Sequence, residues 1–332
     1  MPSSYQPPCS ITPSIIRLIV EVSESLGRMS VLQAVDNLRL RRINRIRTIQ
    51  GSLAIEGNTL SEQQITAIFE GKHVIAPAKE IQEARNAIKA YEQFTGLHAE
   101  NEQDLFLAHR ILMTGLIDEA GVYRSGNVGV MKGEQVLHMA PPANRVPKLM
   151  ADLLAWIASS DQHPLISSSV FHYEFEFIHP FADGNGRMGR LWQTLILSRW
   201  NSLLVQLPIE SMVHSHQDDY YQAINKSTQL SDAAPFVEFM LSTILQTIES
   251  NIQSNSPQVN PQPTPQVNRL LKALAAVKSA MNREELQQAL KLKDRKSFRE
   301  RYLKPALEAE LIEMTIPDKP NSPLQRYQLK KS

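Results

Sequence analysis

The chain has 332 residues, 42% of them hydrophobic, which is enough for two or three domains with a substantial core. Its formal net charge of +1 gives no overall field that selects nucleic acid or a membrane surface. The single cysteine, Cys9, excludes an internal disulfide and fits a reducing, cytoplasmic setting. Neither a signal peptide nor an apolar stretch of about 18 residues, the length of a membrane span, is apparent, so no membrane partner is expected.

The N-terminal part of the chain is expected to be helical after a short tail. Residues 1–11 are interpreted as a flexible tail and residues 12–95 as a group of N-terminal helices. Apolar residues two to four positions apart predict a long amphipathic helix from about residue 31 to residue 55. Its other face is basic, which we interpret as a solvated surface rather than a partner site. The basic residues are Arg39, Arg41, Arg42, Arg45 and Arg47.

This long helix should end at Gly57-Asn58, because glycine and asparagine are common just past a helix end. Glu56 lies in its last turn, where the helix dipole favours cations over anions. The unfavourable position raises the question of which cation Glu56 meets.

Residues 96–252 combine further helices with one β-prone segment. Glycines punctuate the two pieces at 127–130 and 135–139, and this pattern predicts a β-hairpin. The exposed edge of a hairpin could pair with an incoming extended segment, and a plain surface loop is the alternative. Helices are expected at 61–70, 77–94, 102–116, 144–160, 163–178, 191–200 and 234–252, with another opening near residue 215.

Residues 179–190 carry the chemistry and lie between two apolar, helix-forming runs. Their glycines let the backbone approach a ligand, and the first N–H groups of the following helix have no intrahelical partner, so the loop predicts an anion site. Arg187 and Arg190 add forked donors for phosphate oxygens. Asp183 is suited to hold Mg²⁺ beside phosphates. His179 is the group best able to accept a proton near neutral pH.

This stretch matches every defined position of the Fic family signature, His-Pro-Phe-x-[Asp/Glu]-Gly-Asn-Gly-Arg-x-x-Arg, so the chain resembles a Fic-type nucleotidyltransferase. The resemblance implies a mainly α fold with a Fic catalytic core at residues 96–252. It also implies transfer of AMP from Mg-ATP to a Ser, Thr or Tyr hydroxyl of a target protein, the chain itself included. His179 would be the catalytic base and Asp183 the Mg²⁺ ligand. The residues implied for ATP binding are Gly184, Asn185, Gly186, Arg187, Met188, Gly189, Arg190 and Tyr221.

The same resemblance implies self-inhibition. Ser52, Glu56 and Gly57 fit the Ser/Thr-x-x-x-Glu-Gly/Asn pattern of an inhibitory helix, here around residues 52–57, in which Glu56 pairs with Arg190 and misaligns ATP. The hairpin corresponds to the flap that presents the target hydroxyl. One departure is Thr228, where many family members carry an Asn that bears on the ribose or base contacts.

Three other interpretations stay open. A kinase-like relative reverses the nucleotide, although it usually carries Lys where Gly186-Arg187 stand here. Removal of AMP, with Glu56 aligning a water, would use the same residues. A non-enzymatic alternative is a DNA-binding regulator whose Fic core senses a ligand, and failure to bind random duplex at low salt would count against it.

The C-terminal part begins with a linker. Residues 253–266 are polar and proline-rich, which predicts an extended connection. Residues 267–332 predict three helices, the later two capped by Asn282 and Asp294, and two short strands around residues 317–323, an arrangement that resembles a winged helix-turn-helix. This region has 15 Lys and Arg against 8 Asp and Glu. A DNA partner and a protein or homodimer contact are equally supported.

Overall fold

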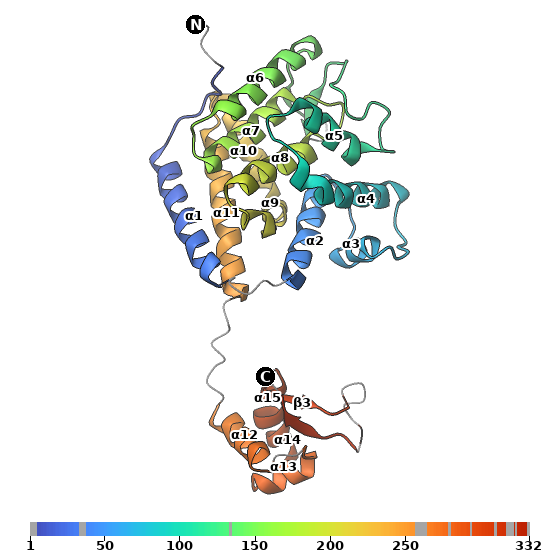
Figure 1. Ribbon diagram of the computed structural model, residues 1–332, viewed down its shortest axis with the longest axis vertical. Helices are drawn as coiled ribbons and strands as arrows, with labels where there is room; N and C mark the ends of the chain where they lie inside the picture. The colour runs from blue at the N-terminus through green and yellow to red at the C-terminus, as the bar shows by residue number, and fades with distance from the viewer. Residues whose placement is uncertain are drawn as a thin grey trace. The chain divides into compact units, whose positions relative to one another are not determined.

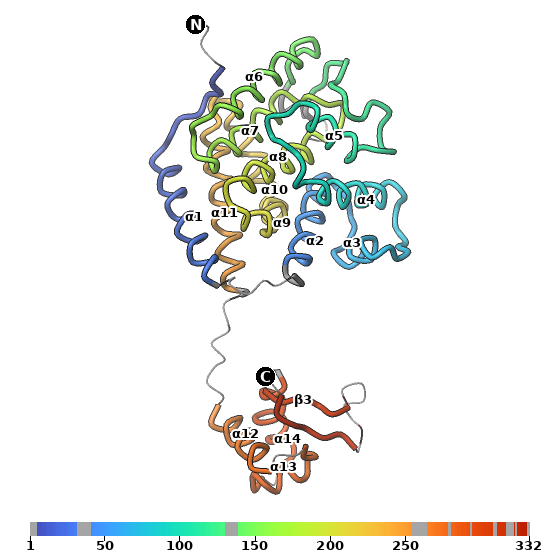
Figure 2. Tube along the Cα trace, viewed as in Figure 1, coloured from blue at the N-terminus to red at the C-terminus, as the bar shows by residue number. Residues whose placement is uncertain are grey.

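The computed structural model describes residues 5–32, 38–132, 135–255, 264–277, 280–292, 294–308, 311–316, 322 and 324–330 (Figures 1 and 2). The chain divides into two units, Met1–Ser254 and Asn255–Ser332. Within the described ranges, no helix combines the length and the apolar character needed to cross a membrane.

Helices make up most of the first unit, so the expected mainly α fold is confirmed. In chain order they are α1 (Pro13–Leu32), α2 (Leu38–Ile55), α3 (Glu62–Phe69), α4 (Ala78–Gln93), α5 (Glu102–Met113), α6 (Val146–Ser159), α7 (Pro164–Ile178), α8 (Asn185–Trp200), α9 (Ile209–Ser215), α10 (Gln217–Leu230) and α11 (Ala234–Asn255). Short 3₁₀ turns lie at Phe94–Gly96, Ala143–Arg145 and Leu204–Gln206.

Helices α7 and α8 form the centre of this unit, with α1 and α11 on one side and α2, α4 and α5 on the other (Figure 1). Nearly every residue of α7 and most of α8 are buried, so packing on all sides, rather than amphipathicity, stabilises them. The largest fully buried side chains of this region are Phe171, Phe175, Phe181 and Trp192. The loop between α7 and α8 is therefore anchored in the core at both ends.

The boundary between the first two helices differs from the expected one. Helix α1 continues to Leu32, so Val31 belongs to α1, and α2 begins at Leu38 rather than near residue 31. The expected start of the long helix is therefore wrong: apolar spacing alone does not mark where one amphipathic helix ends and the next begins.

The C-terminus of α2 lies where glycine predicted it. Gly57 has a φ of 86°, its N–H donates to the Ala54 carbonyl, and the N–H of Asn58 donates to the Leu53 carbonyl. These two bonds form a Schellman motif, in which a glycine without a Cβ adopts the left-handed conformation. The motif leaves Glu56 at the exposed end of α2.

Helix α2 is held against α9 by a close backbone contact. A Cβ on Gly51 would lie 2.5 Å from the backbone nitrogen of Ser211, so only glycine permits this approach. The Ser211 hydroxyl donates to the Arg47 carbonyl at 2.7 Å, and Asn44 Nδ2 donates to the Gln206 carbonyl at 2.7 Å. These contacts fix the axial position of α2 relative to α9 and the preceding 3₁₀ turn, and hence the position of its last turn.

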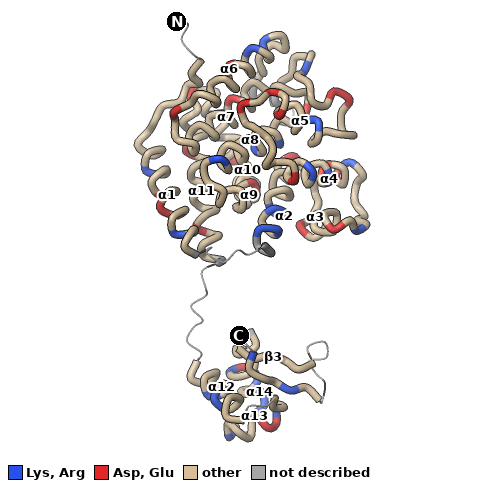
Figure 3. The backbone as a smooth tube through the Cα atoms, viewed as in Figure 1, with Lys and Arg blue, Asp and Glu red and all other residues tan. Residues whose placement is uncertain are grey.

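The basic face of α2 is partly used within the unit. Arg42 pairs with Glu70 at 2.7 Å, and Arg47 pairs with Glu62 at 3.4 Å, so two of its arginines face α3. Figure 3 shows the blue Lys and Arg positions along α2. Because all four side chains are substantially exposed, these pairs contribute little stability.

The predicted hairpin is present. Strands β1 (Gly129–Lys132) and β2 (Gln135–Met139) pair antiparallel, Gly129 opposite Met139, with an irregularity in the register between Val130 and Met131. The expected turn residues 133–134 lie outside the described part of the chain.

The expectation of a flexible tail at 1–11 is wrong for residues 5–11. The Tyr5 hydroxyl donates to Glu174 Oε2 at 2.9 Å, the backbone of Ser10 donates to Asp232 at 3.0 Å, and the Pro8 carbonyl accepts from Ala233. The segment therefore packs on the helical core, because a buried carboxylate and a loop supply partners that the sequence does not reveal. Residues 1–4 are outside the described part.

The second unit contains helices followed by a two-stranded antiparallel sheet. Its elements are α12 (Pro265–Val277), α13 (Arg283–Ala289), α14 (Arg295–Phe298), a π-helical turn (Arg299–Leu303), α15 (Lys304–Glu308), β3 (Ile312–Met314) and β4 (Tyr327–Leu329). Asn282 and Asp294 accept from backbone N–H groups at N2 and N3, so both predicted caps are confirmed. Pro305 explains the π turn, since its ring lacks an N–H and displaces the preceding carbonyls. The linker is shorter than 253–266, because α11 reaches Asn255 and α12 starts at Pro265.

Candidate active site

The loop that joins α7 to α8 begins with a strained residue. His179 caps α7 in the left-handed conformation, with a φ of 52° and a ψ of 62°. For a residue with a Cβ this conformation costs about 1–3 kcal/mol and persists only where the surroundings enforce it. Its N–H still donates to the Phe175 carbonyl at 2.9 Å, so the ring leaves the helix end in a fixed direction, toward the cavity described below.

Arg124 is the group that holds this loop. Its Nε donates to the His179 carbonyl at 2.7 Å, and its backbone N–H donates to the Pro180 carbonyl at 2.9 Å. Its Nη1 and Nη2 donate to the carbonyls of Gly126 and Pro141, on either side of the hairpin, at 2.8 and 2.6 Å. The side chain is 4% exposed. One buried guanidinium therefore joins the base of the hairpin to the catalytic-motif loop, a role that the sequence alone did not suggest.

His109 supports the same loop from α5. It is fully buried, its Nδ1 accepts from the N–H of Gly121 at 2.8 Å, and its Nε2 lies 3.0 Å from the carbonyl of Asp183. Because Nδ1 is the acceptor, Nε2 must carry the proton and donate. The ring stacks on Phe181 at 3.7 Å, and burial lowers its pKa to about 4. His109 is therefore a packed histidine that braces the motif loop from α5.

The start of α8 has the form of an anion cradle. Gly184 precedes the helix with a φ of 81°, and the first N–H groups of a helix lack intrahelical partners. Asn185 is 2% exposed, and its side chain bonds both the N–H and the carbonyl of Phe181 at 2.9 Å. The Asn185 amide thus braces the loop, and the backbone N–H groups of Asn185 and Gly186 are left to face a ligand.

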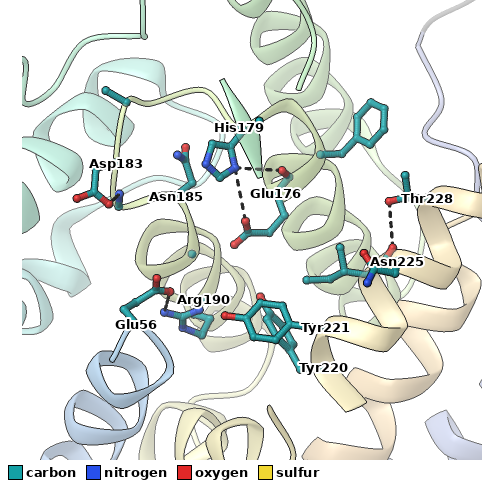
Figure 4. A pocket seen from close by; sticks show the side chains of 16 residues that line it. Glu56, Glu176, His179, Asp183, Asn185, Arg190, Tyr220, Tyr221, Asn225 and Thr228 are labelled. Atoms are coloured by element: carbon teal, nitrogen blue, oxygen red, sulfur yellow. Dashed lines mark hydrogen bonds and ion pairs between the residues drawn. The ribbon is translucent and has the colours of Figure 1, made fainter. Parts of the chain in front are cut away.

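These elements enclose a cavity of about 340 Å³ (Figure 4). Its lining includes most of the predicted site residues: Glu56, His179, Asp183, Gly184, Asn185, Gly186, Arg190 and Tyr221. These residues come from α2, the motif loop, α8 and α10, and the fold gathers them around one cavity.

Arg187, Met188, Gly189, Ser52 and Gly57 are not among the residues that line this cavity. Met188 is fully buried, and a Cβ on Gly189 would meet the His172 ring at 2.7 Å. Met188 and Gly189 therefore face away from this cavity, and their part in ATP binding stays a prediction. The arrangement follows from helical periodicity: Gly186 and Arg190, four residues apart, share the cavity face of α8, whereas Met188 and Gly189 point into the core.

Arg190 is the charge centre of the cavity. Its side chain is 2% exposed, its Nη2 donates to Glu56 Oε1 at 2.7 Å and to the Ser52 carbonyl at 3.0 Å, and its Nε donates to the Ser52 hydroxyl at 3.1 Å. Burial alone would lower its pKa, but Glu56, Tyr220 and Glu176 together raise it, so Arg190 is a permanent cation. The cation that Glu56 contacts at the unfavourable end of α2 is therefore Arg190.

Gly186 makes room for this pair. A Cβ at Gly186 would collide with Oε1 of Glu56, so the carboxylate of Glu56 lies directly over the start of α8. It occupies the space where an anion bound to the backbone N–H groups and to Arg190 would lie.

Arg187 stands next to the cavity through Asp183. Its Nη2 lies 3.2 Å from Asp183 Oδ1 and its Nη1 lies 3.6 Å from Glu83, while the side chain is 6% exposed. Asp183 itself is 50% exposed and faces the cavity. The arginine therefore orients the carboxylate on which a cation could be held.

The opposite wall, on α10, contains residues that the sequence did not single out as well as predicted ones. Tyr220, Ile224 and Asn225 line the cavity beside Tyr221 and Thr228 (Figure 4). Asn225 follows Tyr221 by four residues, a spacing that places both on one helix face, and this signal could have revealed it. The Thr228 hydroxyl donates to the Ile224 carbonyl at 3.0 Å and lies 3.3 Å from the Tyr173 hydroxyl.

Fold and cavity together define a helical protein with an anion-binding helix start beside a histidine. A family model described as "Fic/DOC family" matches residues 99–197, and one described as "Filamentation induced by cAMP protein Fic-like, C-terminal domain" matches residues 265–330. A Fic family protein from Desulfovibrio desulfuricans G20, known from a crystal structure, is 52% identical with a TM-score of 0.76, and the match covers 99% of each chain. The chain belongs to the Fic family.

More distant relatives carry an activity in their names. "Protein adenylyltransferase Fic" from Nematostella vectensis is 31% identical over 206 residues, 58% of this chain and 45% of that protein. "Protein adenylyltransferase fic-1" from Caenorhabditis elegans is 32% identical over 203 residues, 57% of this chain and 37% of that protein. The chain thus spans less than half the length of these curated relatives. A solved structure of Fic-1 (residues 134–508) from C. elegans shares the fold, with a TM-score of 0.58 and 23% identity over 73% of each chain.

Proposed function

We propose that this chain is a protein adenylyltransferase, which transfers AMP from Mg-ATP to a Ser, Thr or Tyr hydroxyl of a target protein or of itself. The observation that carries the proposal is the single cavity shared by His179, the glycine-rich start of α8, Arg190 and Tyr221. A base, an anion cradle and an aromatic wall around about 340 Å³ are the groups that nucleotidyl transfer needs. The names of the relatives support the same activity.

In this proposal the phosphates of ATP lie at the start of α8. The backbone N–H groups of Asn185 and Gly186 donate to the α- and β-phosphates, and Arg190 meets the γ-phosphate. The adenosine lies against α10, where Tyr221 and Asn225 line the cavity. Thr228 replaces a more common Asn, and since its hydroxyl hydrogen already donates to a carbonyl, it can offer a nucleoside only an acceptor.

Asp183 is suited to a Mg²⁺ that arrives with the nucleotide. Within the described residues no group of three His, Cys, Asp or Glu could hold a metal by itself. Mg²⁺ is often bound by one or two carboxylates while phosphate oxygens and water complete its shell, so a lone, half-exposed Asp183 fits. When bound, the ion would neutralise charge on the phosphates, and Arg187 would keep Asp183 aimed at it.

His179 would accept the proton of the target hydroxyl. The hydroxyl oxygen then bonds to the α-phosphorus, the bond from that phosphorus to the β-phosphate oxygen breaks, and pyrophosphate leaves. The N–H groups at the start of α8 stabilise the charge that develops on the α-phosphate. A segment paired with the edge of β1–β2 could present this hydroxyl, because Gly129 of β1 also lines the cavity.

The resting enzyme is proposed to be inhibited by its own α2. Arg190 is the cation that the γ-phosphate would bind, and Glu56 already pairs with it at 2.7 Å. Glu56 and the γ-phosphate would therefore compete for the same guanidinium. Activation then consists of moving or replacing Glu56. The basic C-terminal unit is proposed to recruit a partner, DNA or protein, and titration with random-sequence duplex at low salt separates the two.

The experiment is incubation with Mg²⁺ and α-³²P-ATP, with the purified chain alone and in a cell lysate. We expect weak labelling of the wild type, strong labelling of Glu56→Gly, and loss of label in the double variant with His179→Ala, since removing a general base costs about 10²–10⁴-fold. Full labelling without His179 contradicts the mechanism.

Parallel incubation with γ-³²P-ATP provides the control for reaction class. An adenylyltransferase transfers the α label and not the γ label, whereas a kinase-like relative does the opposite. Loss of label from a previously modified protein on adding the wild type would instead favour AMP removal.

A further inference from the structure

Glu176 is a cavity residue that the Fic signature does not contain. It lies on the last turn of α7, three residues before His179, and its side chain is 12% exposed. Its Oε2 lies 3.9 Å from Nδ1 of His179, and its backbone carbonyl lies 3.4 Å from the same nitrogen (Figure 4). Both oxygens of one residue thus face the ring nitrogen that points away from the proposed hydroxyl.

The carboxyl group of Glu176 is not fully hydrogen-bonded within the described residues. Its Oε1 is buried without a hydrogen-bond partner among the described residues. His172 Nε2 lies 3.9 Å away, but Nδ1 of His172 donates to Gln193 Oε1 at 2.7 Å, and its Nε2 accepts from the Tyr220 hydroxyl at 3.1 Å. His172 is therefore neutral, with a pKa lowered to about 3 by burial, and has no proton to give.

The other groups around Glu176 are charged or polar and come from three helices. Arg190 of α8 attracts it but is already bound to Glu56 and Ser52 of α2. Tyr220 and Tyr221 of α10 line the same cavity. Burial raises the pKa of Glu176 to about 7 against the opposing effect of Arg190. A new positive charge on the His179 ring, 3.9 Å away, is thus a change in the proposed reaction that would give this carboxylate a partner.

We propose that Glu176 is the positioning residue of His179: it holds the ring with its proton on Nδ1 and stabilises the imidazolium that forms when Nε2 takes the hydroxyl proton. This role rests on the proposed function. The hydroxyl proton moves to Nε2, the oxygen bonds to the α-phosphorus and pyrophosphate leaves. The Nδ1 proton stays between the ring and Glu176, and the ring loses its extra proton to water after product release.

The geometry also sets the size of the effect. An opposite charge within about 4–6 Å of a titrating group shifts its midpoint by 1–3 pH units. Because Glu176 is only partly ionised near neutral pH, we expect the lower end of this range, roughly one unit. Glu176→Gln keeps the shape and the backbone carbonyl and removes the charge.

Glu174 offers a matched control on the same helix. It is also buried with a raised pKa, but it accepts from the Tyr5 hydroxyl at 2.9 Å and does not line the cavity. In the Glu56→Gly background, NMR titration of the histidine rings should show the His179 midpoint lowered by about one pH unit in Glu176→Gln and unchanged in Glu174→Gln. The His179 signal is assigned by its loss in His179→Asn.

Kinetics provide the second readout. In Glu176→Gln the acidic limb of the kcat profile should move to lower pH by the same amount, kcat at its plateau should fall, and KM for ATP should stay within about twofold. Glu176→Asp, with its carboxylate one methylene farther from the ring, should give an intermediate midpoint. An unshifted His179 midpoint in both Glu176 variants overturns the proposal. Absence of labelling in every variant, with the midpoint shifted as expected, overturns the adenylyltransferase assignment instead.

Discussion

Replacing Glu56 by Gln tests whether the Glu56–Arg190 contact limits activity. Gln keeps the size of the side chain and the packing of α2, and it removes the negative charge from the pair. Any gain in activity then reports on charge and not on a missing helix turn, which Glu56→Gly cannot separate because glycine also loosens the helix end.

The magnitude follows from burial on the two sides of the contact. A hydrogen bond between charged groups contributes about 1.5–3 kcal/mol. Arg190 is 2% exposed, but Glu56 is 35% exposed, so water screens part of the attraction. We therefore take the lower half, about 1.5–2 kcal/mol, which corresponds to a roughly 10–30-fold gain in ATP affinity and in the labelling rate at low ATP.

The assay is the initial rate of auto-labelling as a function of ATP concentration, with ATP affinity from calorimetry. Glu62→Gln is the control, since it removes another carboxylate that pairs with α2, through Arg47 at 3.4 Å, without touching Arg190. Glu62→Gln should match the wild type. If Glu56→Gln binds and uses ATP no better than Glu62→Gln, the inhibition hypothesis fails.

Three other substitutions follow from the contacts. Gly51→Val places a side chain against the backbone of Ser211; overpacking by about 1–3 kcal/mol should lower the melting temperature and, by lifting α2, raise labelling above that of wild type. Arg124→Lys cannot span the carbonyls of His179 and the hairpin base, so kcat should fall about tenfold or more while ATP affinity, measured by calorimetry, is preserved. The pKa of His109 is lowered to about 4 from an ordinary 6.5, so as pH falls the unfolded chain binds the extra proton before the folded chain does. Between pH 6.5 and 4 the urea midpoint of the wild type should therefore fall relative to that of His109→Gln. Midpoints that change in parallel in the two proteins would contradict a neutral buried ring.

The sequence was most informative where one short segment contains the chemistry. His179, Asp183, Gly184 and Arg190 lie within twelve residues, and local rules for helix starts and anion binding apply to them directly. For Glu56 the local clue, its unfavourable place before the stop at Gly57, raised only the question of a cation partner. The pairing with Arg190 was implied by the Fic resemblance.

Other features depend on contacts between distant segments. Arg124 binds the loop at His179 across 55 residues of sequence, and nothing near Arg124 indicates which carbonyls it meets. That Met188 and Gly189 face away from the cavity could not be predicted, because a signature fixes residue order but not the phase of the helix relative to the cavity. Tyr5 could not be assigned to the core, since a buried Glu174 on α7 is what holds it.

Three carboxylates, those of Glu56, Glu176 and Asp183, line the cavity together with the buried cation Arg190, and under the proposed inhibition this arrangement would oppose ATP binding. A polyphosphate can enter only if each carboxylate finds another way to lose or balance its charge. Asp183 can meet the Mg²⁺ that accompanies ATP, and Glu176 can take a proton, since its pKa is about 7, or face the His179 ring. Glu56 is paired with Arg190, and of the two carboxylates that border Arg190 it is the more exposed, at 35% against 12% for Glu176, and it stands at the open end of α2. Under the proposed inhibition, displacement of Glu56 into solvent is therefore the step on which ATP binding should depend.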